Sequence, residues 1–126
     1  MRCQVTVETT ADGKKTKISR EGDLQITSTG ASLSYTEDKA NVTLTLQNGT
    51  VQIVRKGDYT LCMRLEKGQT TSASLSLGGS VGEMQTTTER VGYAIRENEL
   101  SLHLKYTLIA TGDPQKMQVK IYAKGV

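Results

Sequence analysis

The chain has 126 residues, which is enough for one domain spanning residues 1–126 with a core that needs no metal or disulfide support. Its net charge is +3, its basic side chains are scattered, and it contains neither Trp nor Phe. Nucleic-acid-binding proteins gather positive charge and stacking aromatics, so we expect no nucleic-acid partner and interpret the basic run 14–20 as a solvated hairpin. The chain shows no signal peptide and no membrane-spanning run, so we expect a cytoplasmic protein without a membrane partner.

Apolar and polar residues alternate along nearly the whole chain, which is the period-two pattern of half-buried strands. No window has the spacing of a long amphipathic helix. The strongest turn is Asn48–Gly49, because a type I′ turn requires positive φ at both central positions. This turn places Leu46 opposite Val51 and Leu44 opposite Ile53, so turn chemistry and hydrophobic pattern agree.

The same test predicts the other hairpins in chain order. In the first half of the chain, the expected connections are Asp12–Gly13 (Val7 opposite Ile18, Glu8 opposite Lys17), Thr29–Gly30 (Leu24 opposite Tyr35, Ile26 opposite Leu33) and the loop 36–41 (Tyr35 opposite Val42). The next two are Lys56–Gly57–Asp58 (Val51 opposite Met63, Ile53 opposite Leu61) and the loop 66–70 (Leu61 opposite Leu75, Met63 opposite Ala73). The last two are the loop 96–99 (Ile95 opposite Leu100, Tyr93 opposite Leu102) and the loop 109–116 (Leu104 opposite Ile121, Tyr106 opposite Val119).

About ten consecutive antiparallel strands with short loops form a long meander, whose free edges are removed by closure. The sequence therefore predicts an all-β fold, a single antiparallel up-and-down barrel of about 8–10 strands. Within 84–95, the residues expected to face inward are even-numbered up to Thr88 and odd-numbered from Val91 onward. A strand can make this change of parity only through an extra residue, which predicts a β-bulge within 89–92.

The glycine-rich stretch "SLGGSVGEM" (76–84) resembles a phosphate-binding loop in its glycine content, but such a loop requires a helix directly after its glycines. The residues after Gly82 alternate as a strand. We therefore interpret Gly78 to Val81 as a hairpin connection, with Gly82 opening the next strand.

Several short motifs, in order and spacing from about Asp23 onward, resemble one bacterial family. They include the S-Y-x-E of 34–37, the R-x-G of 55–57, "GEMQTTTERV" at 82–91 and the Y-x-L of 106–108. The chain resembles the YwiB-like proteins, a calycin-like barrel family of unknown function. The resemblance implies a lipocalin-like barrel in a bacterial cytoplasm and implies no activity. The stretch 77–81 departs from the aromatic-flanked pattern of that family.

Arg55 is the unusual residue, because counting by two from Val51 and Ile53 places it on the inward face, opposite Tyr59. Either it is held by Glu37 or Asp58 and stacked on Tyr59, or its planar donors bind the carboxylate or phosphate of a ligand inside the barrel.

Four tyrosines share the inward parity and are expected to fill the core or to line a cavity: Tyr35, Tyr59, Tyr93 and Tyr106. The outward parity of His103, beside Lys105, makes it a poor base or metal ligand. Cys3 is predicted to face inward and Cys62 outward, which argues against a disulfide. We therefore expect no catalytic residue, no metal site and no cofactor.

The primary hypothesis is a non-enzymatic barrel that binds a small amphipathic or acidic ligand through Arg55, Tyr59, Tyr35, Tyr93 and Tyr106. The alternative is a solidly packed barrel that acts as a protein-interaction or oligomerisation module, for example as a homodimer. An interior cavity of a few hundred Å³ would favour the first hypothesis.

Overall fold

The alternating segments form ten antiparallel strands in the computed structural model, which describes residues 1–110 and 113–126. Each strand pairs with the next along the chain, and the first strand pairs with the last, so the sheet closes into an up-and-down barrel as predicted. The strands are β1 (Arg2–Ala11), β2 (Lys14–Ile26), β3 (Gly30–Glu37), β4 (Ala40–Gln47), β5 (Thr50–Lys56), β6 (Tyr59–Leu65), β7 (Thr70–Leu77), β8 (Ser80–Arg96), β9 (Glu99–Ile109) and β10 (Gln115–Gly125).

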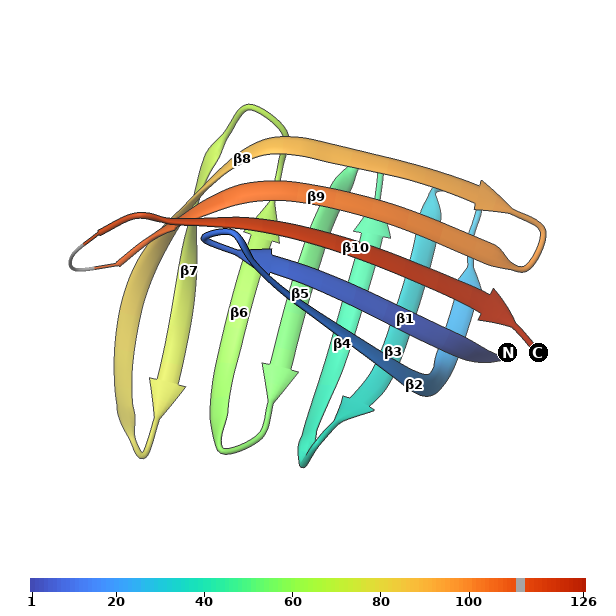
Figure 1. The fold of residues 1–126 in the computed structure, drawn as a ribbon, viewed down its shortest axis with the longest axis horizontal. Coiled ribbons are helices and arrows are strands. Elements are labelled where there is room, and N and C mark those ends of the chain that lie inside the picture. Colours follow the sequence, from blue (N-terminus) through green and yellow to red (C-terminus); the bar gives the residue numbers. More distant parts are fainter. Residues whose placement is uncertain (111–112) are drawn as a thin grey trace.

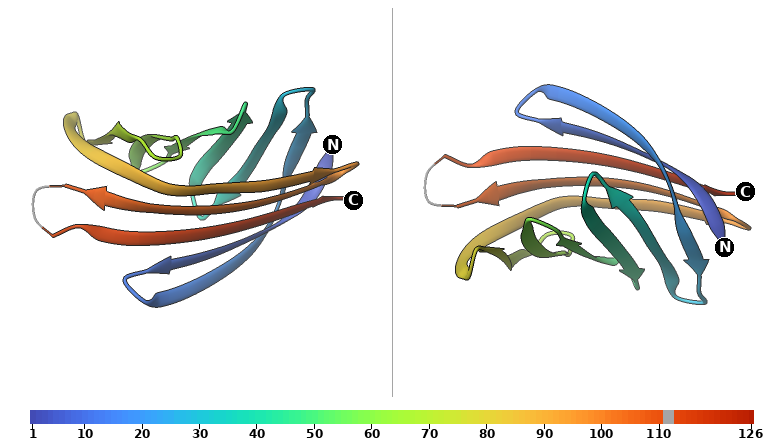
Figure 2. Two further views of the ribbon diagram at one scale, coloured as in Figure 1. Left: turned by 90° about the horizontal axis from the view of Figure 1, so that it is seen from above. Right: turned by 90° about the horizontal axis from the view of Figure 1, so that it is seen from below.

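The barrel is flattened into two layers whose strands cross. Figure 1 shows β8, β9, β10 and β1 running across β3 to β6, and Figure 2 shows the same layers from above and below. The two longest strands, β2 and β8, belong to both layers. β2 pairs with β3 only through residues 22–26, and β8 pairs with β7 only through residues 80–87. The other part of β2 therefore pairs with β1 alone, and the other part of β8 pairs with β9 alone.

The two long strands turn from one layer to the other at specific residues. In β8 the register with β9 shifts between Thr88 and Arg90, which confirms the bulge predicted within 89–92. In β2 the turn lies at Gly22, where a Cβ atom would approach the carbonyl oxygen of Ser34 to 2.4 Å. Only glycine allows β3 to come this close to β2.

Five of the predicted hairpins have the predicted register. Leu46 lies opposite Val51 across the Asn48–Gly49 turn, and both turn residues have positive φ, at 51° and 79°. The other confirmed pairs are Val7–Ile18, Glu8–Lys17, Leu44–Ile53, Tyr35–Val42, Leu61–Leu75, Ile95–Leu100 and Tyr93–Leu102.

Three predicted registers are wrong, each by two residues. Leu24 lies opposite Leu33 rather than Tyr35, and Ile53 lies opposite Met63 rather than Leu61. The third wrong register is that of the β9–β10 hairpin. The observed pairs are Ile26–Ala31 and Gly22–Tyr35 in the β2–β3 hairpin, Val51–Leu65 and Arg55–Leu61 in the β5–β6 hairpin, and Leu104–Val119 and Tyr106–Met117 in the β9–β10 hairpin. A shift of two residues leaves every side chain on the same face, so the hydrophobic pattern cannot detect it.

Several connections are shorter than predicted, and those expected at 56–58, 66–70 and 96–99 are shorter by one or two residues each. The loop expected at 36–41 reduces to Asp38 and Lys39, and the glycine-rich connection reduces to Gly78 and Gly79, because β8 already begins at Ser80. Residues 111–112 of the loop expected at 109–116 lie outside the described residues.

The core lies between the two layers and consists of the inward-facing residues. It includes Cys3, which is fully buried; Cys62 is half-buried, and both thiols are free. Two polar side chains are also buried there, Thr86 at 0% and Thr88 at 1% exposed, and neither hydroxyl has a hydrogen-bond partner in the described part of the chain. Among the described residues no helix has the length and hydropathy needed to span a membrane.

Candidate ligand cavity in the barrel

The barrel interior contains a cavity of about 320 Å³ that reaches from the core to one mouth. Small-molecule pockets have volumes of about 300–1,000 Å³, so the cavity is of the size that holds one small ligand. Its apolar walls are Val7, Ile18, Val42, Leu44, Ile53, Leu61, Met63, Met117, Val119 and Ile121, and its polar groups are Thr9, Thr16, Tyr35, Glu37, Arg55, Tyr59 and Tyr106.

Arg55 lies near the end of β5, and its side chain is 18% exposed. Its Nη1 atom donates to Asp58 Oδ1 at 3.3 Å and to the carbonyl oxygen of Tyr59 at 3.2 Å, and the guanidinium lies 3.9 Å from the centroid of the Tyr59 ring. The register places Leu61, not Tyr59, directly opposite Arg55, which corrects the sequence prediction. All of these hydrogen bonds involve Nη1, so Nε and Nη2 have no partner within 1–110 and 113–126.

The loop between β5 and β6 fixes this arrangement. The backbone N–H of Tyr59 donates to Asp58 Oδ1 at 3.2 Å, and the N–H of Gly57 donates to the Tyr59 carbonyl oxygen at 3.1 Å. A Cβ atom at Gly57 would come within 2.8 Å of the Cβ of Ala40. The loop therefore packs closely on the start of β4, which holds Asp58 next to Arg55.

Two buried tyrosines line the same cavity from opposite layers, Tyr35 from β3 and Tyr106 from β9. Burial raises the pKa of Tyr106 to about 12; burial and then the nearby Glu37 carboxylate raise the pKa of Tyr35 to about 12. Neither hydroxyl forms a hydrogen bond to another described residue. Both phenols are thus neutral at pH 7 and available as donors.

Glu37 is a lining residue that sequence reasoning treated only as a candidate partner of Arg55. The structure places Glu37 on the cavity wall with no ion pair among the described residues, whereas Arg55 pairs with Asp58. The sequence alone could have indicated the inward position of Glu37, because it follows the inward residues Leu33 and Tyr35 at spacings of two.

The remaining predicted residues lie elsewhere. Tyr93 follows the bulge, is 50% exposed and does not line the cavity. His103 lies on the outer face of β9, and its Nε2 is 2.8 Å from Gln118 Nε2. Burial lowers the His103 pKa, with further contributions from Arg90, Lys120 and Lys105.

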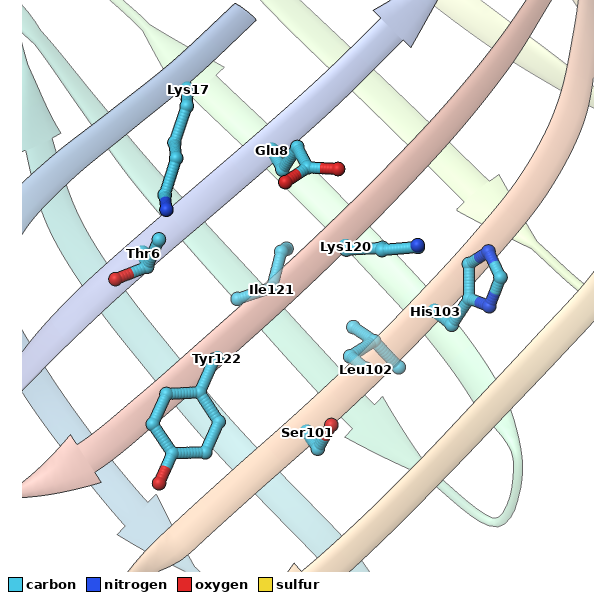
Figure 3. A pocket seen from close by; sticks show the side chains of 9 residues that line it. All are labelled: Thr6, Glu8, Lys17, Ser101, Leu102, His103, Lys120, Ile121 and Tyr122. Atoms are coloured by element: carbon cyan, nitrogen blue, oxygen red, sulfur yellow. The ribbon is translucent and has the colours of Figure 1, made fainter. Parts of the chain in front are cut away.

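A second, open hollow of about 380 Å³ lies on the outer face of β2, β1, β10 and β9. Figure 3 shows the nine residues that line it, with Lys17, Glu8, Lys120 and His103 on adjacent strands. In the part of the chain that the structure describes, no three metal-ligating side chains come together. The interior cavity combines an apolar wall with one guanidinium, one carboxylate and three phenols.

Comparison with known proteins identifies the family of the chain and a solved structure with the same fold. Residues 2–121 match the model of a domain of unknown function, DUF1934, so the chain belongs to that family. The crystal structure of the ywiB protein from Bacillus subtilis is similar to this chain with a TM-score of 0.84 and 18% identity, over 99% of this chain and 92% of that chain. This confirms the predicted resemblance and the barrel fold. No curated protein matches the sequence.

Proposed function

We propose that this barrel is a non-enzymatic binding protein for a small amphipathic ligand with an acidic group. The observation that carries the proposal is the interior cavity of about 320 Å³, which brings Arg55, Tyr59, Tyr35 and Tyr106 together on an otherwise apolar wall. The apolar body of a ligand would pack against the walls, while its acidic group would accept hydrogen bonds from the free Nε and Nη2 of Arg55.

The alternative function, a packed module for interaction or oligomerisation, has less support. It requires a filled interior and a large apolar outer patch. The interior instead contains the cavity. The large apolar side chains exposed among the described residues are Leu77 and Val81 on the β7–β8 hairpin, Met1 and Val126 at the adjoining chain ends, and Tyr93 and Tyr122 on β8 and β10.

Two fluorescent probes test the proposal. 8-Anilinonaphthalene-1-sulfonate combines an apolar body with an anionic group, and N-phenyl-1-naphthylamine is a neutral analogue of similar shape. We expect the folded protein to bind both. Arg55→Gln should weaken sulfonate binding by about 10- to 100-fold, the range of a charge-assisted hydrogen bond, and leave binding of the neutral probe nearly unchanged.

The matched control is Arg64→Gln, which removes an outward-facing arginine of β6 whose ion pair with Glu66 is exposed. It should change neither affinity. Equal effects of the two substitutions, or sulfonate binding that Arg55→Gln leaves intact in a folded protein, would exclude Arg55 as the anchor. Native mass spectrometry of protein purified from its own host would then identify any retained molecule.

A further inference from the structure

The outer face of the layer formed by β2, β1, β10, β9 and β8 gathers positive charge that is scattered in the sequence. Strand registers align its side chains in rows, one of which runs Lys17, Glu8, Lys120 and His103 (Figure 3). The outward cations are Arg2, Lys15, Lys17, Arg90, Arg96, Lys105, Lys116, Lys120 and Lys124. The acidic residues are Glu8, Glu21, Asp23, Glu99 and, beside the bulge, Glu89. The nine cations exceed the five carboxylates by four charges, which is more than the net charge of +3 of the whole chain.

Three of the five carboxylates already form ion pairs with cations of the same face. Glu8 pairs with Lys15 at 3.2 Å, Glu99 pairs with Lys124 at 3.6 Å, and Glu21 pairs with Arg2 at 3.8 Å. Six outward cations therefore have no ion pair in the part of the chain that the structure describes: Lys17, Arg90, Arg96, Lys105, Lys116 and Lys120.

Two of these cations lie directly opposite each other. Arg90 and Lys105 are cross-strand partners, an arrangement of like charges that destabilises a sheet. Next to them, His103 has a pKa lowered by burial and then by Arg90, Lys120 and Lys105. An anion bound over this region would relieve the repulsion among these groups.

The polar residues between the cations favour a phosphate backbone over an acidic protein. Side chains of Ser, Thr, Gln and Tyr donate to nucleic-acid phosphates alongside Lys and Arg, and this face offers Thr6, Thr10, Ser101, Thr107, Gln118 and Tyr122. Protein interfaces, in contrast, are depleted in lysine and have an apolar centre. Here four of the six unpaired cations are lysines. Within the described residues of β2, β1, β10, β9 and the part of β8 that pairs with β9, Tyr122 is the one large exposed hydrophobic residue with an outward side chain.

We propose that this outer face binds the phosphate backbone of a double-stranded nucleic acid without reading its sequence. A duplex fits better than a splayed single strand, because single-strand binding relies on several stacking aromatics. With strands about 4.8 Å apart and about 3.4 Å per residue, the face measures roughly 19 by 27 Å, which spans several phosphates. The sequence predicts no such partner because the cations are far apart along the chain, and only the strand registers bring them together.

The test is the salt dependence of binding to a short fluorescein-labelled duplex of mixed sequence, followed by anisotropy between about 50 and 200 mM salt. We expect affinity to fall steeply with salt. The triple variant Lys105→Gln/Lys116→Gln/Lys120→Gln should bind at least tenfold more weakly at low salt, and the slope of log affinity against log salt should lose about 3 in magnitude.

The matched control is Lys39→Gln/Lys56→Gln/Lys67→Gln, which removes the same charge from exposed positions outside this face. It should keep most of the affinity and slope. Equal losses in both variants would mean that only net charge matters and would overturn the assignment, as would the absence of binding at low salt. Tighter binding to labelled polyglutamate than to the duplex would identify an acidic protein as the partner instead.

Discussion

At the residue scale, burial of Tyr35 and Tyr106 makes the fold sensitive to alkali. The folded-state pKa of each phenol is about 12, whereas an unfolded tyrosine titrates near about 10. Because the folded value is the higher one, the contribution of each neutral phenol to stability is complete below pH ~10 and is lost as the pH rises through about 12. Two pKa units correspond to about 3 kcal/mol for each residue.

We therefore predict that the urea midpoint falls between pH 10 and 12 and that Tyr106→Phe makes this fall markedly shallower. Tyr122→Phe, which changes an outward tyrosine that is 43% exposed, should follow the wild type. Absorbance at 295 nm in native protein should show two phenols that ionise late. A pH dependence in Tyr106→Phe identical to that of the wild type would mean that Tyr106 is not buried as a neutral phenol.

The sequence predicted which residues face inward, but it could not predict which of them lie at the same end of the barrel. Parity placed Arg55, Tyr35, Tyr59 and Tyr106 inside, and these four line one cavity. Parity also placed Tyr93 on the inward face, yet the bulge and the single-sided pairing of the second half of β8 leave it half exposed. A period of two says which face a residue occupies and says nothing about its position along the barrel.

At the element scale, the corner of β2 depends on the absence of a side chain at Gly22. A Cβ atom there would lie 2.4 Å from the carbonyl oxygen of Ser34 and 3.1 Å from Val5 Cγ2, so two strands would have to move apart. We predict that Gly22→Ala destabilises the protein by about 2–3 kcal/mol, in the range of overpacked cores.

The comparison is Gly82→Ala in β8, where the nearest atom to a Cβ would be the Leu75 carbonyl oxygen at 3.9 Å. That change should be neutral or slightly stabilising, because it only reduces the freedom of the unfolded chain. Urea unfolding at pH 7 measures the free energy of unfolding of both variants. If Gly22→Ala cost no more than Gly82→Ala, the tight corner would not be a feature of the folded protein.

The elements themselves followed from the sequence wherever turn chemistry was explicit. Asn48–Gly49 and Asp12–Gly13 supply two positive φ values each, and their hairpins have the predicted register. Among the connections without such a pair, those at Thr29–Gly30 and Lys56–Gly57–Asp58 differ from the predicted register by two residues, whereas those at 36–41, 66–70 and 96–99 have the predicted register. Hydrophobic pairing is equally good after such a slip, so only the local turn geometry decides.

At the scale of the whole molecule, the barrel is closed by its two most distant strands. β1 pairs with β10, for example Val5 with Ala123, whereas the other pairs join strands that are neighbours in the chain. The loop entropy of this closure has to be offset by contacts that form late.

We predict that mutations at the closure and within a local hairpin act on different rates. Val5→Ala at the β1–β10 contact should mainly accelerate unfolding, whereas Leu44→Ala in the β4–β5 hairpin should mainly slow refolding. Both side chains are 1% exposed, so both substitutions should lower stability measurably. Stopped-flow chevron plots separate the two effects, and the opposite assignment of rates would mean that closure precedes hairpin formation.

The pairing of β1 with β10 also brings the chain ends together, as Figure 1 shows with N and C side by side. The N–H of Val126 donates to the carbonyl oxygen of Arg2 at 2.9 Å, so a linker of a few residues would span the gap. The exposed Gly78–Gly79 turn between β7 and β8 offers a place for new ends. The order of strands along the gene is therefore not a requirement of the barrel, and a circular permutant opened at this turn would retain every strand pairing and the interior cavity.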